Sequence, residues 1–184
     1  LPDGTHPMQL VTSGPDNPEE PIHRAHVFAI QSARERVWLT TPYFVPTEAA
    51  MYALTSAALR GLDVRLLVPE KSDSAIVTAA ARSYFDELIH SGVKVYEYQA
   101  RMLHSKTLVV DDNMAIIGTA NFDNRSFRLN YEVCAIGYGA ALNGRLEEQF
   151  MTDISRSRLV EMDRKQAFLP RLGDSVARLF SPLL

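Results

Sequence analysis

The sequence predicts an α/β fold: a mixed, mostly parallel β-sheet with helices on both faces. Two observations lead to this prediction. Helix-like and strand-like segments alternate over residues 19–98, which is typical of a sheet built from β-α-β units. A pair of short strands then flanks Asp111-Asp112-Asn113, and an antiparallel hairpin there would make the sheet mixed. We expect residues 1–184 to form a single domain with a helical tail from about residue 142.

Apolar periodicity and the residues that start or stop helices predict the individual elements. Strands are expected where β-branched and aromatic residues gather or alternate with polar ones, over 8–11, 37–41, 64–68, 93–98, 106–110, 115–117 and 132–138. Helices are expected over about 19–35, 47–59 and 72–91, with Ser72 or Asp73 as the cap of the third. Gly61 and Gly92 end the second and third helices. Residues 118–130 read as a polar loop, and the tail reads as two or three amphipathic helices.

Composition narrows the class of function. The net charge of -3 argues against a nucleic-acid partner, because phosphate backbones are held mostly by Lys and Arg. The single Cys134 excludes an internal disulfide and a cysteine-based zinc site. His23 and His26 lie three residues apart on a predicted helix and would suit a metal, but no third ligand is evident. No run of about 20 uncharged apolar residues occurs, so we expect this segment to be soluble.

His104 and Lys106 are the residues most suggestive of chemistry. On the strand predicted here their side chains would share one face, because strand side chains alternate with a period of two. An imidazole beside an ammonium group suits a phosphate. The ammonium group would neutralise a phosphoryl oxygen, and the imidazole would attack phosphorus or transfer a proton. A His-x-Lys pair on a strand is common by itself, so the segments that follow decide its interpretation.

The residues after this pair supply further phosphate ligands. Between Gly118 and Ser126 the chain offers hydroxyl, amide and backbone N–H donors, which hold phosphate oxygens without adding charge. Glu132 then opens the last predicted strand. Its carboxylate would accept a hydrogen bond from the second ring nitrogen of His104 and so set the tautomer. The ordered succession of pair, loop and acid within thirty residues predicts a phosphate site.

These segments resemble a known superfamily. His104-Ser-Lys106-x(4)-Asp111, followed by Gly118-Thr-Ala-Asn121, is similar to the signature of the phospholipase D superfamily. Within it, Thr-Pro-Tyr-Phe-Val-Pro (41–46) and Asn-Phe-Asp-Asn-Arg-Ser-Phe-Arg-Leu-Asn-Tyr-Glu (121–132) resemble the cardiolipin synthases. The resemblance implies a phospholipase D-like α-β-α sandwich and a reaction that needs no metal or other cofactor.

The resemblance also implies a two-step transfer. One histidine attacks phosphorus and forms a phosphohistidine, a second histidine protonates the leaving alcohol, and an incoming hydroxyl reverses the process. The implied substrate is phosphatidylglycerol, and the products are cardiolipin and glycerol. The implied location of the full-length enzyme is a membrane surface, the cytoplasmic face of a bacterial inner membrane.

Carried over by position, the resemblance assigns roles to individual residues. The expected catalytic residues are His104, Lys106, Asp111, Asn121 and Glu132. Substrate contacts are expected from Thr119, Ser126 and Tyr43. His104 would be the nucleophile or the general acid, Lys106 and Asn121 would bind phosphoryl oxygens, and Glu132 would orient His104. Asp111 is expected to support the fold through hydrogen bonds more than to touch substrate.

The family's active site needs two such motifs, and this sequence has one. The other histidines, His6, His23, His26 and His90, lack a lysine two residues on. We therefore expect the chain to be the C-terminal half of a longer two-motif enzyme. Its partner would be the other half of that enzyme or a second subunit across a twofold axis.

Two alternatives remain open. One is a homodimeric nuclease or phosphodiesterase with one motif per subunit, against which the acidic balance counts. The other is an isolated half that is inactive alone. The tail also carries basic residues among apolar ones: Arg156, Arg158, Arg164, Lys165, Arg171 and Arg178. Such residues occur in helices that lie on membranes, although helix faces packed on the core are the favoured interpretation here.

Overall fold

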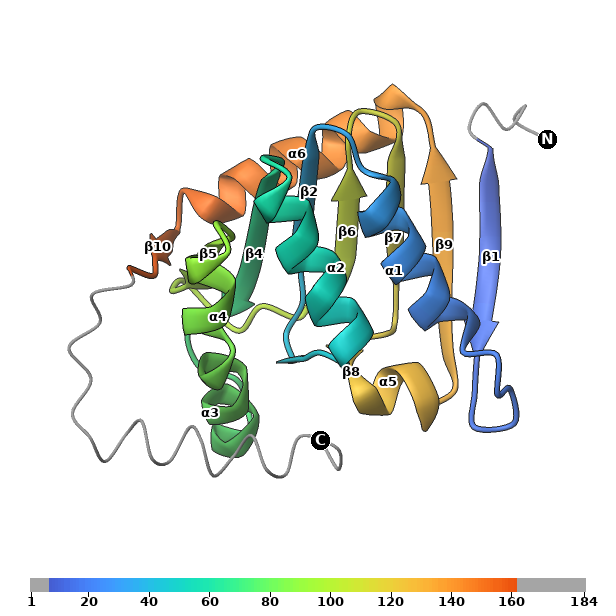
Figure 1. The fold of residues 1–184 in the computed structure, drawn as a ribbon, viewed down its shortest axis with the longest axis horizontal. Helices are drawn as coiled ribbons and strands as arrows, with labels where there is room; N and C mark the ends of the chain where they lie inside the picture. The colour runs from blue at the N-terminus through green and yellow to red at the C-terminus, as the bar shows by residue number, and fades with distance from the viewer. Residues whose placement is uncertain (1–6, 162–184) are drawn as a thin grey trace.

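An eight-stranded sheet with helices on both faces forms the centre of the molecule (Figure 1). The computed structural model describes residues 7–161. In spatial order the strands are β1 (Met8–Ser13), β9 (Glu132–Tyr138), β7 (Met114–Gly118), β6 (Thr107–Val110), β2 (Arg36–Thr40), β4 (Asp63–Pro69), β5 (Lys94–Tyr98) and β10 (Ser157–Leu159). A smaller parallel pair joins β3 (Phe44–Val45) to β8 (Phe122–Asp123). The helices are α1 (Pro21–Ser32), α2 (Glu48–Leu59), α3 (Ala75–Ser83), α4 (Phe85–His90), α5 (Asn124–Arg128) and α6 (Ala140–Ile154).

The α/β class, the mixed sheet and the helices on both faces are confirmed, but the prediction of a mostly parallel sheet is wrong. Only β2 with β4 and β4 with β5 pair in parallel in the large sheet, and its other five pairings are antiparallel. Parallel neighbours require a crossover connection, usually a helix. Here α2 connects β2 to β4, and α3 with α4 connects β4 to β5. β6 and β7 are joined by a tight turn, and the connection from β7 to β9, which holds β8 and α5, begins and ends at one end of the sheet, so these three strands run antiparallel.

Alternating side chains on the central strands fill two cores. Val37 and Leu39 of β2 belong to the larger core, beneath α1 and α2, while Trp38 belongs to the smaller core on the opposite face. Trp38 stacks on Phe150 of α6 with ring centroids 5.0 Å apart. Figure 1 shows α1 and α2 in front of the sheet and α6 behind its upper end. The sheet is thus the middle layer of an α-β-α sandwich.

The helix predictions succeed where a cap is strong. Thr47 caps α2, and its hydroxyl accepts a hydrogen bond from the Ala50 amide at 3.2 Å. The helix predicted over 72–91 is instead two helices, α3 and α4, which meet at Tyr84. The ring of Tyr84 packs edge-on against Phe44. The cap of α3 is Ser74, because the Ser72 hydroxyl is bonded to Thr78.

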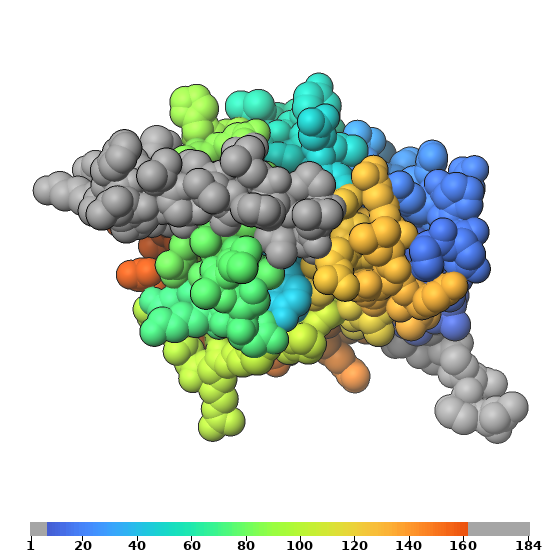
Figure 2. Space-filling view, turned by 90° about the horizontal axis from the view of Figure 1, so that it is seen from below, coloured from blue at the N-terminus to red at the C-terminus, as the bar shows by residue number. Residues whose placement is uncertain are grey.

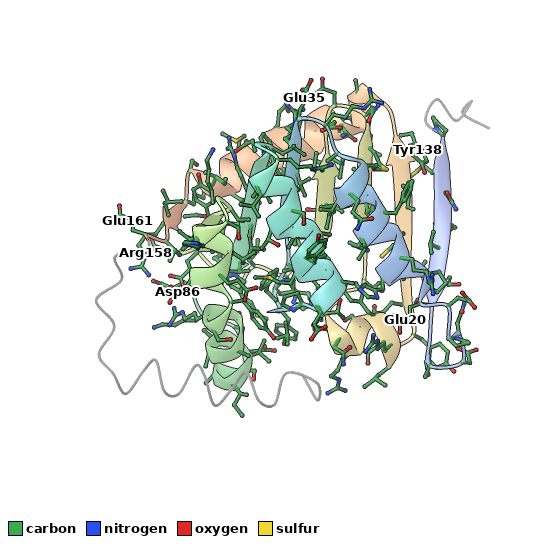
Figure 3. The ribbon with its side chains drawn as sticks, in the orientation of Figure 1. Glu20, Glu35, Asp86, Tyr138, Arg158 and Glu161 are labelled. Atoms are coloured by element: carbon green, nitrogen blue, oxygen red, sulfur yellow. The ribbon has the colours of Figure 1, made fainter. Side chains whose placement is uncertain are left out.

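Helix α6 occupies the beginning of the predicted helical tail, but the segment after it is the strand β10. β10 pairs antiparallel with the edge of β5. It is held there by Arg158, whose guanidinium donates to Glu97 at 2.6 Å. Glu97 is only 3% exposed and also accepts from Arg82 at 2.9 Å. Figure 3 shows Arg158 at the β10 edge. The rest of the predicted tail, residues 162–184, lies outside the described residues, and within 7–161 no helix is long and apolar enough to cross a membrane.

Asp111 holds the β6–β7 turn against the start of β2. Its carboxylate accepts hydrogen bonds from the backbone amides of Arg34, Glu35 and Arg36 at 2.9–3.2 Å. Its backbone is left-handed, with φ 48°. Asp111 lies at the end of β6 remote from His104, so its contacts are those of a residue that supports the fold.

Replacement of Asp111 should therefore destabilise the protein. We expect Asp111→Ala to lower the free energy of unfolding by about 3 kcal/mol, since several charge-assisted hydrogen bonds are lost and alanine tolerates positive φ poorly. Asp112→Ala, which removes an exposed ion pair with Arg36, should cost less than about 1 kcal/mol. Urea unfolding of the two variants measures this difference, and equal costs would contradict the role given to Asp111.

Candidate active site

The predicted site residues other than Asp111 gather at one end of the sheet. Thr107, the first residue of β6, lies opposite Thr40, the last residue of β2, and opposite Ile117 near the end of β7. The chain segments that leave these strands therefore meet at this end. Figure 2 looks onto it and shows the segments near residues 43, 104 and 122 in light blue, yellow-green and gold. The Thr41 hydroxyl joins two of them by accepting a hydrogen bond from the Phe122 amide at 3.0 Å.

His104 and Lys106 lie just ahead of β6, not on it as predicted. The strand begins at Thr107, which lies opposite Thr40, the last residue of β2. His104 is exposed, and Lys106 is partly buried with its ammonium group bonded to the backbone oxygen of His104 at 2.9 Å. This contact holds the two residues of the pair together without a strand.

The environment of Lys106 affects its charge. Burial lowers the pKa of Lys106, while the nearby carboxylates of Glu132 and Asp123 act in the opposite direction. The ammonium group thus lies in a partly dry setting, where its attraction for an anion is stronger than in bulk water. Such a cation is suited to neutralising a phosphoryl oxygen.

Thr119 and Glu132 are brought together at this end. The Thr119 hydroxyl donates to one oxygen of Glu132 and accepts from the Val133 amide at 3.0 Å. The other oxygen of Glu132 accepts from the Asn130 side chain at 3.3 Å. The expected hydrogen bond between Glu132 and His104 is not formed within residues 7–161, because the Glu132 oxygens face the loop while His104 faces solvent.

The predicted polar loop contains two short elements, β8 and α5. Ser126 closes it: its hydroxyl accepts from the Asn121 amide at 3.1 Å, and its own amide donates to Asp123 at 2.7 Å. Ser126 has no exposed surface. Contrary to the expected substrate contact, its hydroxyl is used inside the loop, where it shapes the backbone around Asn121.

Tyr43 lies beside this loop because β3 pairs with β8. Its hydroxyl donates to Asp73. That hydrogen bond, together with burial and the charges of Asp73 and Asp123, raises the pKa of Tyr43 to about 12. The phenol therefore stays neutral at physiological pH.

Sequence reasoning missed Asp123. This carboxylate is 3% exposed, and burial raises its pKa. It caps α5 and lies close enough to Lys106 and Tyr43 to affect the charge of both. The available signal was an aspartate three residues ahead of Ser126, the spacing of a helix cap. The segment was predicted to be a loop because a helix of five residues is too short to show apolar periodicity.

The alternative of a metal at His23 and His26 finds no support. The His23 ring nitrogens bond to Glu20 at 2.7 Å and to Thr47 at 2.8 Å. His26 donates through Nδ1 to the Ile22 carbonyl at 2.8 Å. No group of three metal-binding side chains occurs among residues 7–161. Both histidines are accounted for by hydrogen bonds within the fold.

Comparison with known proteins identifies the family. Residues 27–154 match the family described as cardiolipin synthase, PLD-like domain. The chain belongs to this family. It is 47% identical over 179 residues to cardiolipin synthase 2 of Bacillus anthracis, a match that covers 96% of this chain and 35% of that protein. It is 45% identical over 184 residues to the cardiolipin synthase of Geobacillus kaustophilus (strain HTA426), a match that covers 99% of this chain and 37% of that protein.

The chain thus spans little more than a third of the length of these curated relatives. Among solved structures it is similar to Nuc, a phospholipase D family member from Salmonella typhimurium, with a TM-score of 0.73. The match covers 85% of this chain and 99% of Nuc at 22% sequence identity, so it shows the fold alone. The predicted superfamily and its fold are confirmed.

The buried His26 makes stability depend on pH. Burial lowers its pKa to about 4 from an ordinary value of 6.5. The stability that comes from burying the neutral ring is therefore present above pH 6.5 and is lost as the pH falls toward 4, by up to about 3 kcal/mol. His26→Asn keeps a donor near the position of Nδ1 but does not titrate.

We expect this variant to show a flatter decline of unfolding free energy between pH 6.5 and 4 than the parent chain. The exposed His90 provides the control, since His90→Asn should retain the steep decline. Denaturant unfolding at several pH values checks both, and an unchanged slope in His26→Asn would refute the assignment.

Proposed function

We propose that this chain forms one half of the active site of a cardiolipin synthase, which transfers a phosphatidyl group from one phosphatidylglycerol molecule to another. The observation that carries the proposal is the convergence of His104, Lys106, Thr119 and Asn121 at one end of the sheet. An exposed imidazole, a partly buried cation and uncharged donors are the groups that phosphoryl transfer requires. Family membership supports the same chemistry.

The proposed reaction has two displacements. In the first, a histidine nitrogen bonds to phosphorus, the bond to the glycerol oxygen breaks, and a second histidine gives that oxygen its proton. In the second, the terminal hydroxyl of another phosphatidylglycerol attacks phosphorus, returns a proton to the second histidine and displaces the first. Lys106 would neutralise the phosphoryl oxygens in both steps, and His104 would serve as one of the two histidines.

The second histidine would come from elsewhere. His23 and His26 are engaged in hydrogen bonds in the fold, and His90 lies at the end of α4. The curated relatives have nearly three times the length of the matched segment, which leaves room for a second motif. We propose that the other half of such an enzyme, or a second subunit, faces His104 at a membrane surface where the lipid substrates lie.

Removal of the imidazole tests this function. In the complete two-half enzyme, His104→Ala should lower the rate of cardiolipin formation from phosphatidylglycerol by about 1000-fold or more, because no other group replaces the nucleophile or acid. His90→Ala, at an exposed position on α4, should leave the rate unchanged. Labelled lipid products separated by chromatography give the rates, and normal cardiolipin formation by His104→Ala would refute the assignment.

A further inference from the structure

The carboxylate of Asp123 is a buried hydrogen-bond acceptor inside the loop that carries Asn121. The Ser126 backbone amide donates to it at 2.7 Å, and the side chains of Ser126 and Asn121 lie close enough to lower the pKa that burial raises. The Ser126 hydroxyl in turn accepts from the Asn121 amide at 3.1 Å. Asp123 and Ser126 therefore fix the backbone that carries the Asn121 side chain.

Asp123 differs from the other buried carboxylates in lacking an ion pair. Among residues 7–161 three carboxylates are buried: Glu97, Asp123 and Asp153. Glu97 is paired with Arg82 and Arg158. Asp153 accepts from Gln149 and lies on α6, remote from the site. No cation bonds to Asp123 within this range, and a buried negative charge without a paired cation is costly.

Helix capping does not require this charge. Asn, Ser and Thr cap helices about as well as Asp, and α5 has only five residues. A neutral cap would therefore avoid the cost of burying a carboxylate. The charge should have another use at this position, and the cation within its reach is Lys106.

We propose that Asp123 is a positioning residue of the phosphoryl-transfer site, which orients the Asn121 amide and stabilises the ammonium group of Lys106. This inference rests on the proposed function. An asparagine amide has two N–H groups. With the Asn121 side chain beside Asp123, one of them would face the carboxylate and the other would be left for a phosphoryl oxygen. Asp123 thus aligns an uncharged donor and a cation toward the same anion without touching substrate.

The other titratable groups near Asp123 already form hydrogen bonds with other residues. Glu132 accepts from Thr119 and Asn130, and it also acts on the charge of Lys106. The Tyr43 hydroxyl donates to Asp73. Replacing Asp123 alone should therefore remove one of the two carboxylates that favour the protonated form of Lys106, and leave the Glu132 contacts in place.

The test separates the negative charge of Asp123 from its role as a helix cap, and it uses the complete enzyme. Asp123→Asn keeps a helix cap of the same size and removes the charge. We expect its thermal unfolding midpoint to stay close to that of the parent, while kcat/KM for phosphatidylglycerol falls by about 10- to 100-fold. The alkaline limb of the pH profile should move to lower pH, because Lys106 loses its proton more easily without the neighbouring negative charge. Asp153→Asn, at a buried carboxylate remote from the site, should change neither quantity.

A second readout needs no catalysis. Carbon NMR of the lysine side chains, with Lys106 assigned through Lys106→Arg, should show Lys106 titrating at lower pH in Asp123→Asn than in the parent. Unchanged kcat/KM and an unchanged titration would overturn the proposal and leave Asp123 as a helix cap. If Asp123→Asn does not fold, Asp123→Ser provides a second neutral helix cap for the same measurements. If neither variant folds, Asp123 serves the fold alone and the proposal is overturned. Failure of the proposed function would instead appear as a parent enzyme that makes no cardiolipin.

Discussion

The antiparallel pairing of β6 with β2 is the constraint on which the site depends. It brings the beginning of β6 to the same end of the sheet as the carboxyl ends of β2 and β4, where ligands bind in open α/β sheets. Because β7 returns antiparallel to β6, and β9 antiparallel to β7, the loop after Gly118 and the start of β9 reach this end as well. The directions of β6, β7 and β9 therefore bring His104, Lys106, Asn121 and Glu132 to one end of the sheet. The direction of β6 also sends Asp111 to the opposite end, where its carboxylate holds the backbone.

Burial and hydrogen bonding determine the charge and the orientation of the side chains at this end of the sheet. Lys106 is partly withdrawn from water, so its charge is weakly screened, and carboxylates on two different segments keep that charge favourable. The hydroxyl of Thr119 is held by Glu132, and the backbone at Asn121 is held by Ser126, whose own amide bonds to Asp123. A site whose donors are already oriented needs little reorganisation when an anion arrives. The exposed His104 is the exception, and its environment would be completed by the second half of the site.

Much of this could be predicted from the sequence, because the informative signals are local. The β-α-β portion shows strong periodicity, and the cap at Thr47 defines the start of α2 to the residue. Strand direction is not local: β1 pairs with β9, with Met8 opposite Gly137, and no nearby residue specifies that pairing. β10 has only three residues and depends on the distant carboxylate of Glu97. The candidate site residues were predicted from type and spacing, whereas the burial of Ser126 and of Asp123 depends on packing that spacing does not reveal.

The most direct test of the central claim is to trap the covalent intermediate. The complete enzyme would be mixed with phosphatidylglycerol labelled at phosphorus and quenched within the first turnover. Digestion into peptides would then show which residue carries the label. The account predicts an acid-labile label on a histidine, either His104 or its counterpart in the second half, and loss of that label in His104→Ala whichever of the two attacks. Full labelling in His104→Ala, or a label on a residue other than histidine, would contradict it.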